Sequence, residues 1–228
     1  MFEGLKEKTE KLREKFIGPR EVYFENGVSF VAKVTEEEPH LALMKDEREE
    51  FNFKSFVPPE TKLIFDMTKP WGTYFKKENK PPKIVVGKFT DIDGILAFLH
   101  EAGHLANELS YNLALSAKQK HSQEINKRWE ENVYDASRLL AMKHEREAVI
   151  LNERNAWAFA LKKARWLERT YGISILEKIG DNKKVFEFIN GFLNTYEQGY
   201  LNELYKIDIF SKEQMEQLFA DLEKSSQE

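Results

Sequence analysis

The chain has 228 residues, 41% of them hydrophobic and 32% charged, so it can bury a sizeable core beneath a heavily charged surface. The formal net charge of −4 argues against nucleic-acid binding as its main task, and the lack of cysteine excludes disulfides and thiolate metal ligands. No signal peptide and no apolar run of membrane-spanning length is recognisable. We therefore expect a cytoplasmic protein that does not enter a membrane.

The first part of the chain differs in pattern from the rest. Residues 1–18 are predicted to form a separate charged helix, because their apolar residues recur at helical spacing. Residues 19–228 are predicted to form one domain, β-rich over 19–89 and α-helical over 90–228. The expected class is therefore α+β, with a mostly antiparallel sheet at the N-terminal end.

Several strands are predicted in the β-rich part. Asn26-Gly27 separates two alternating segments, which indicates a hairpin over residues 21–34. Residues 62–67 and 83–89 are also predicted strands. Each is a candidate for an edge strand that would bind a peptide by strand addition.

The next predicted helix contains an H-E-x-x-H motif, His100-Glu101-Ala102-Gly103-His104. Four residues make about one helical turn, so the two histidines project from the same face and can bind one metal ion. Glu101 lies beside them, within reach of a water on that metal. Zinc in such a setting is typical of metallopeptidases. Gly103 is unfavourable in a helix and indicates close approach of another backbone or of a substrate.

A third metal ligand must come from elsewhere, because catalytic zinc usually has three protein ligands and no further ligand motif follows His104. Glu153 on a later helix is our candidate. Its helix carries small residues one turn apart on the nearby face: Ala156, Ala160 and Ala164. Such residues let two helices approach closely, as a shared metal site requires. Glu147 is the alternative, since it precedes an apolar run.

The remaining chain is predicted to be helical. A long helix is expected over about residues 122–171 with a break near Ile150, followed by helices over 182–206 and 211–224. The aromatic residues of the predicted helix over 182–206 are expected to lie in the core: Phe186, Phe188, Phe192, Tyr196 and Tyr200.

The motif His100-Glu101-x-x-His104 with the downstream Glu153-x-x-Ala156-x-x-Phe159-Ala160 resembles the gluzincin metallopeptidases. More narrowly, it is similar to the ImmA/IrrE family of bacterial metallopeptidases, over about residues 83–161. The resemblance implies a zincin-like fold, with His100, His104 and Glu153 as Zn²⁺ ligands and Glu101 as the general base.

These patterns predict a zinc-dependent metallopeptidase that acts on a peptide or protein substrate. A catalytically silent zinc-binding sensor or interaction module is the alternative hypothesis, and a helical protein with a chance motif is the third. Candidates for stabilising the substrate oxygen are Tyr111, Tyr134, His144 and Tyr171. Candidates for orienting the histidines are Asn107, Asp135 and Asn155. The pattern leaves the oligomeric state open.

Overall fold

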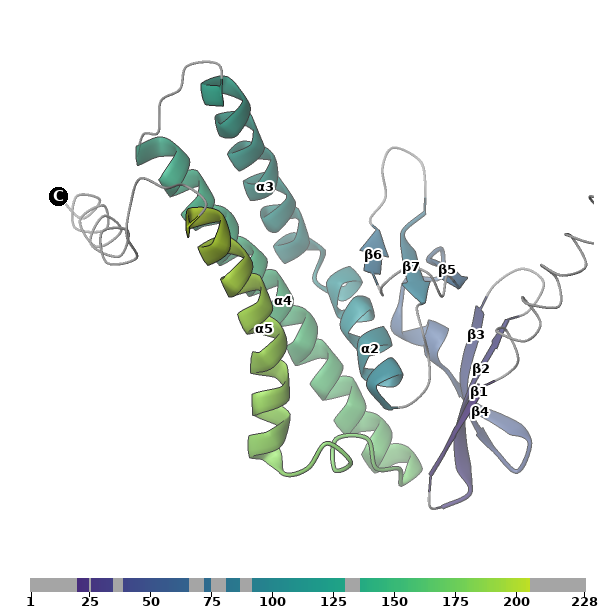
Figure 1. The fold of residues 1–228 in the computed structure, drawn as a ribbon. Coiled ribbons are helices and arrows are strands. Elements are labelled where there is room, and N and C mark those ends of the chain that lie inside the picture. The colour runs from purple at the N-terminus through teal and green to yellow at the C-terminus, as the bar shows by residue number, and fades with distance from the viewer. Residues whose placement is uncertain are drawn as a thin grey trace, which may run out of the picture.

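The computed structural model describes residues 20–24, 26–34, 39–65, 72–74, 81–86, 92–129 and 136–205. The predicted helices over residues 1–18 and 211–224 lie outside these ranges. Within them the fold is α+β: seven strands come first, and four long α-helices follow (Figure 1). This agrees with the predicted division into a β-rich and a helical part.

The first four strands form one antiparallel sheet in sequential order. They are β1 (Arg20–Tyr23), β2 (Val28–Val34), β3 (Pro39–Lys45) and β4 (Arg48–Asn52). The predicted hairpin is confirmed, because β1 and β2 pair across Asn26-Gly27 and Gly27 has a φ of 76°. The Asn26 amide donates hydrogen bonds of 2.7 Å to the carbonyls of Tyr171 and Gly172, which ties this turn to the end of a distant helix.

The other three strands form a second, mixed sheet, which the sequence did not predict as a separate unit. They are β5 (Lys62–Phe65), β6 (Gly72–Tyr74) and β7 (Lys83–Val86). The central strand is β7, parallel to β5 and antiparallel to β6. The prediction that residues 83–89 form an edge strand is therefore wrong, since both sides of β7 are already paired. Within the described part, β5 and β6 lie at the edges.

The four helices are α2 (Ile92–Ala106), α3 (Glu108–Trp129), α4 (Ala136–Tyr171) and α5 (Asn182–Tyr205). The predicted break near Ile150 is wrong, because α4 continues through it and contains neither glycine nor proline. This helix ends at Gly172, which has a φ of 65° and donates its N–H to the carbonyl of Glu168 at 2.9 Å. None of the described helices is long and apolar enough to cross a membrane.

Helix α2 is almost entirely buried, between the strands on one side and α4 on the other (Figure 1). Aromatic rings connect it to the first sheet: the ring centroid of Phe53 lies 4.7 Å from that of Phe30 on β2 and 5.8 Å from that of Phe98 on α2. Burial of both faces of α2 explains why the segment is so apolar.

Candidate metal centre

The two motif histidines lie on one face of α2, as the spacing predicts. Their Nε2 atoms are 3.2 Å apart, and only 8% of His100 and 7% of His104 is exposed. Glu101, also buried, lines the same pocket.

Glu153 reaches this pair from α4. Its Oε2 atom lies 3.1 Å from Nε2 of His100 and 3.6 Å from Nε2 of His104. Glu147, the alternative candidate, is exposed and forms an ion pair with Lys143 on its own helix. The structure therefore brings Glu153, and not Glu147, to the histidines.

Close packing of α2 against α4 makes this arrangement possible. A Cβ atom added to Gly103 would lie 2.5 Å from the carbonyl oxygen of Ala156 and 2.8 Å from its Cα atom. The predicted approach of another backbone at Gly103 is thus confirmed, and that backbone is α4. Ala156, Ala160 and Ala164 are all fully buried, as the small-residue pattern predicts.

The spacing of the three donor atoms fits a metal ion. A tetrahedral ion with bonds of about 2.0–2.1 Å holds neighbouring ligand atoms about 3.3–3.4 Å apart. The observed separations of 3.1, 3.2 and 3.6 Å lie around that value. Oε2 of Glu153 is buried beside the two histidine nitrogens but makes no well-formed hydrogen bond, so a cation bound between the three atoms would satisfy it. His100, His104 and Glu153 could therefore hold a metal ion.

The local charges prepare the carboxylate for this role. Burial alone would raise the pKa of Glu153, but the two histidines lower it by more than burial raises it, so the pKa falls to about 2. Burial alone would lower the pKa of His104, but Glu153, together with Glu101 and Asn152, raises it above 6.5. Glu153 is therefore ionised at neutral pH, whereas His104 must give up its proton before it can bind a metal.

Asn152 orients His104, a role that the sequence did not reveal. Its Nδ2 atom lies 3.1 Å from Nδ1 of His104, and its Oδ1 atom accepts a hydrogen bond of 3.2 Å from the hydroxyl of Ser110 on α3. When Nε2 of His104 binds a metal, Nδ1 carries the proton and donates it to the amide oxygen. In that state the amide is turned relative to the arrangement above, so that its oxygen faces His104 and its nitrogen donates to the hydroxyl of Ser110, which itself donates to the carbonyl of Asn107.

The residues predicted to orient the histidines do not do so. The side chain of Asn107 donates to the carbonyl of Gly103 at 2.7 Å and so closes the end of α2. Asn155 is half-buried without a hydrogen bond to either ring among the described contacts. Asp135 lies outside the described residues.

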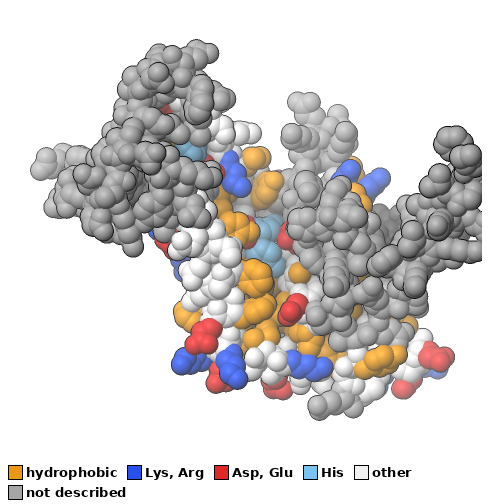
Figure 2. Space-filling model, in the orientation of Figure 1, with side chains coloured by type: hydrophobic (Ala, Val, Ile, Leu, Met, Phe, Trp, Pro, Cys, Tyr) orange, Lys and Arg blue, Asp and Glu red, His pale blue; other side chains and the backbone are white. Residues whose placement is uncertain are grey.

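The pocket around the candidate metal ligands has a volume of about 280 Å³ and lies between α2, α3, α4 and α5. Histidine side chains are visible near the middle of the face in Figure 2, beside hydrophobic side chains. Tyr111 of α3 lines the pocket, as does Tyr196 of α5. Burial raises the pKa of both phenols, and the Glu153 carboxylate adds to the effect at Tyr196, so both keep their protons at neutral pH.

Tyr196 was predicted to be a core residue and is instead a site residue. The prediction for the aromatic residues of α5 is only partly correct, because Phe186 is 65% exposed and Phe192 is 45% exposed, whereas Phe188 packs on the core. Among the tyrosines and histidine proposed for the substrate oxygen, only Tyr111 lies at the described pocket. Tyr171 packs against Phe51 and Trp166, His144 is exposed, and Tyr134 is outside the described residues.

No family model, no curated protein and no solved structure matches this chain. An account of its function must therefore start from the chemistry of the pocket.

Proposed function

We propose that this chain is a zinc-dependent metallopeptidase with a zincin-like fold, in which His100, His104 and Glu153 bind the zinc. The observation that carries the proposal is the convergence of their donor atoms at 3.1–3.6 Å in a buried pocket that also contains Glu101. Two imidazoles and one carboxylate are a donor set found in catalytic zinc sites, which keep one position open for water.

The residues around this donor set match the needs of peptide hydrolysis. Zinc, when bound, supplies a Lewis acid that activates water and polarises the peptide carbonyl. Glu101 accepts the proton of the attacking water and delivers it to the nitrogen of the leaving amine as the C–N bond breaks. The protonated hydroxyl of Tyr196 or Tyr111 donates a hydrogen bond to the negative charge that develops on the carbonyl oxygen.

The β6 strand is the edge to which we expect a peptide substrate to bind. It lies at one edge of the mixed sheet and contacts α2, which carries the motif. A peptide that paired with this edge would lie alongside the active-site helix. In the described part of the chain, β6 pairs only with β7.

The test begins with the zinc content of the purified protein and its His100→Ala variant. We expect about one zinc per chain in the wild type and loss of zinc in the variant. Hydrolysis of labelled casein and of a peptide mixture is then compared between wild type and Glu101→Gln. Glu108→Gln is the matched control, because Glu108 is exposed at the start of α3.

We expect Glu101→Gln to retain zinc and lose hydrolysis by about 10²-fold or more, while Glu108→Gln behaves as the wild type. Retained zinc without any hydrolysis by the wild type would favour the sensor or interaction module. Absence of bound zinc, even after zinc is added at neutral pH, would contradict both the metallopeptidase and the zinc-binding sensor hypotheses.

The two tyrosines are distinguished by Tyr196→Phe and Tyr111→Phe. The tyrosine that stabilises the oxyanion should lower kcat when its hydroxyl is removed, with KM and zinc content largely unchanged. If neither substitution lowers kcat, the oxyanion is stabilised by another group.

A further inference from the structure

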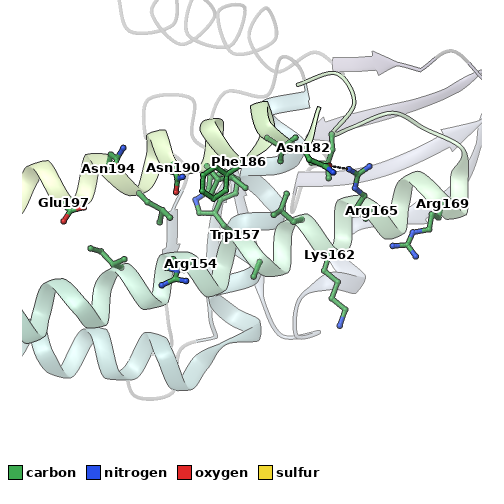
Figure 3. A pocket seen from close by; sticks show the side chains of 17 residues that line it. Arg154, Trp157, Lys162, Arg165, Arg169, Asn182, Phe186, Asn190, Asn194 and Glu197 are labelled. Carbon is green, nitrogen blue, oxygen red and sulfur yellow. Dashed lines mark hydrogen bonds between the residues drawn. The ribbon is translucent and has the colours of Figure 1, made fainter. Parts of the chain in front are cut away.

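A second and larger hollow lies between α4 and α5, here called the α4–α5 groove. It encloses about 880 Å³ and runs along α4 from Ile150 to Arg169 and along α5 from Asn182 to Glu197. Figure 3 shows this groove with the two helices on either side of Trp157. The stretch of α5 is about 22 Å long, which is the length of about seven residues of extended peptide.

The groove is strongly cationic along α4. Four cations line it: Arg154, Lys162, Arg165 and Arg169. Glu197 is the only acidic residue among its described lining, and it is already paired with Arg146. Arg165 is paired with Glu168 at 3.0 Å, whereas no carboxylate in the described part of the chain pairs with Arg154, Lys162 or Arg169. A ligand with several negative charges would complement this edge.

The α5 side presents amides in place of charges. Asn190 and Asn194 lie one turn apart and line the groove, and Asn182 accepts a hydrogen bond of 3.1 Å from Arg165 across it (Figure 3). A side-chain amide both donates and accepts, as a peptide group does. A row of such amides along one wall suits the backbone of an extended chain.

Apolar side chains form the remainder of the lining. Phe186 is 65% exposed, and Leu161 of α4 and Ile189 and Leu193 of α5, which also pack against the core, line the groove as well. An exposed apolar patch with a charged rim is typical of a surface that binds another chain.

We propose that the α4–α5 groove binds an acidic peptide segment in extended conformation. Its carboxylates pair with the α4 cations, its backbone bonds to the α5 amides, and its apolar side chains cover Phe186 and its neighbours. The binding does not depend on the proposed peptidase activity. The groove nevertheless borders the candidate metal centre. The indole of Trp157 lines the groove, and its ring centroid lies 4.5 Å from that of His100. A segment bound here lies next to the catalytic pocket.

The test is fluorescence anisotropy of the full-length protein with a labelled ten-residue peptide of alternating glutamate and leucine. A peptide of alternating lysine and leucine and a labelled thymidine oligonucleotide of similar length serve as comparison probes. The groove variant is Arg154→Glu/Arg169→Glu. The matched control is Lys45→Glu/Lys62→Glu, which reverses the same number of charges at exposed positions on β3 and β5. Circular dichroism checks that each variant is folded.

We expect saturable binding of the acidic peptide, weakening with added salt, and about tenfold or greater loss in the groove variant but not in the control. Asn190→Ala/Asn194→Ala should weaken binding without changing its salt dependence. The proposal is overturned if the acidic peptide does not bind, if the basic peptide binds equally well, or if the control variant loses as much. Tighter binding of the oligonucleotide would assign the groove to nucleic acid. A dimer that the groove variant dissociates would assign it to a second copy of the chain.

Discussion

The contact between Gly103 and Ala156 gives the sharpest test of the helix packing that brings together the proposed metal ligands. In Gly103→Ala, the added methyl would meet the Ala156 carbonyl oxygen at 2.5 Å. An ordinary carbon–oxygen contact is about 3.3 Å, so α4 must move away from α2 by about 0.8 Å. The atom in the way belongs to the backbone, and a side-chain rotation cannot relieve the contact.

Two opposing effects determine the change in stability. Overpacking of this kind costs about 1–3 kcal/mol, while replacing glycine by alanine in a helix gains about 1 kcal/mol. We therefore expect the metal-free Gly103→Ala protein to lose about 1 kcal/mol, which lowers Tm by roughly 2–4 °C in a chain of this size.

The effect on metal binding should be larger than the effect on stability. Metal–ligand distances tolerate only about 0.2 Å of displacement. Moving α4 carries Glu153 away from His100 and His104, since the carboxylate and Ala156 lie on the same turn of the helix. We expect zinc affinity to fall by at least about 10–100-fold, the loss typical of disturbed support around a metal site.

Chelator competition measures the zinc affinity, and denaturant unfolding with chelator present measures the stability. Gly191→Ala on α5 is the matched control, because an added Cβ would meet nothing within 4 Å. It should gain up to about 1 kcal/mol and keep its zinc. If Gly103→Ala gains stability as the control does and binds zinc equally well, the argument from close packing is wrong.

Three further predictions concern the same centre. Glu153→Ala should abolish zinc binding, whereas Glu147→Ala should not; the reverse result, by metal analysis, would exchange the two roles. Asn152→Ala should weaken zinc binding by about 10–100-fold in chelator competition without unfolding the protein, and unchanged affinity would show that it does not orient His104. The third concerns pH. The pKa of His104 is raised, so its protonated form stabilises the metal-free protein fully below pH 6.5, and this stabilisation is lost as the pH rises through the raised pKa. The pKa of Glu153 is lowered from 4.5 to about 2, so its ionised form stabilises the protein fully above pH 4.5, and this stabilisation is lost as the pH falls towards 2. Zinc must displace the His104 proton, so the Tm gained from zinc should increase from pH 5.5 to 8 in thermal scans, and a gain independent of pH would contradict this pairing.

Local patterns account for what could be predicted from the sequence. The common face of His100 and His104 follows from the period of a helix, and the hairpin follows from the turn preference of Asn26-Gly27. Both depend on residues close together in the chain. Glu153 was a weaker inference, because small residues on its helix indicate a close neighbour but do not identify it.

Long-range packing decided the rest. Asn152 reaches His104 across 48 residues of sequence, and Tyr196 enters the pocket from α5. Neither position has a local signal, because the direction in which a side chain points into a neighbour depends on how the helices cross. Strand order is likewise non-local, so a pattern that predicts a strand over residues 83–89 cannot show that β7 lies between β5 and β6.

The sequence by itself therefore determined the α+β class, the main helical segments and the paired histidines beside Glu101, because each of these follows from the spacing of residues that are close together in the chain. The sequence ranked Glu153 ahead of Glu147, and the tertiary structure places Glu153 beside the histidines. Only the tertiary structure brought Asn152 and Tyr196 to the pocket and formed the groove beside Trp157. The physical reason is that these features depend on the contact of α2, α4 and α5, and the free energy of that contact is shared among residues far apart in the chain.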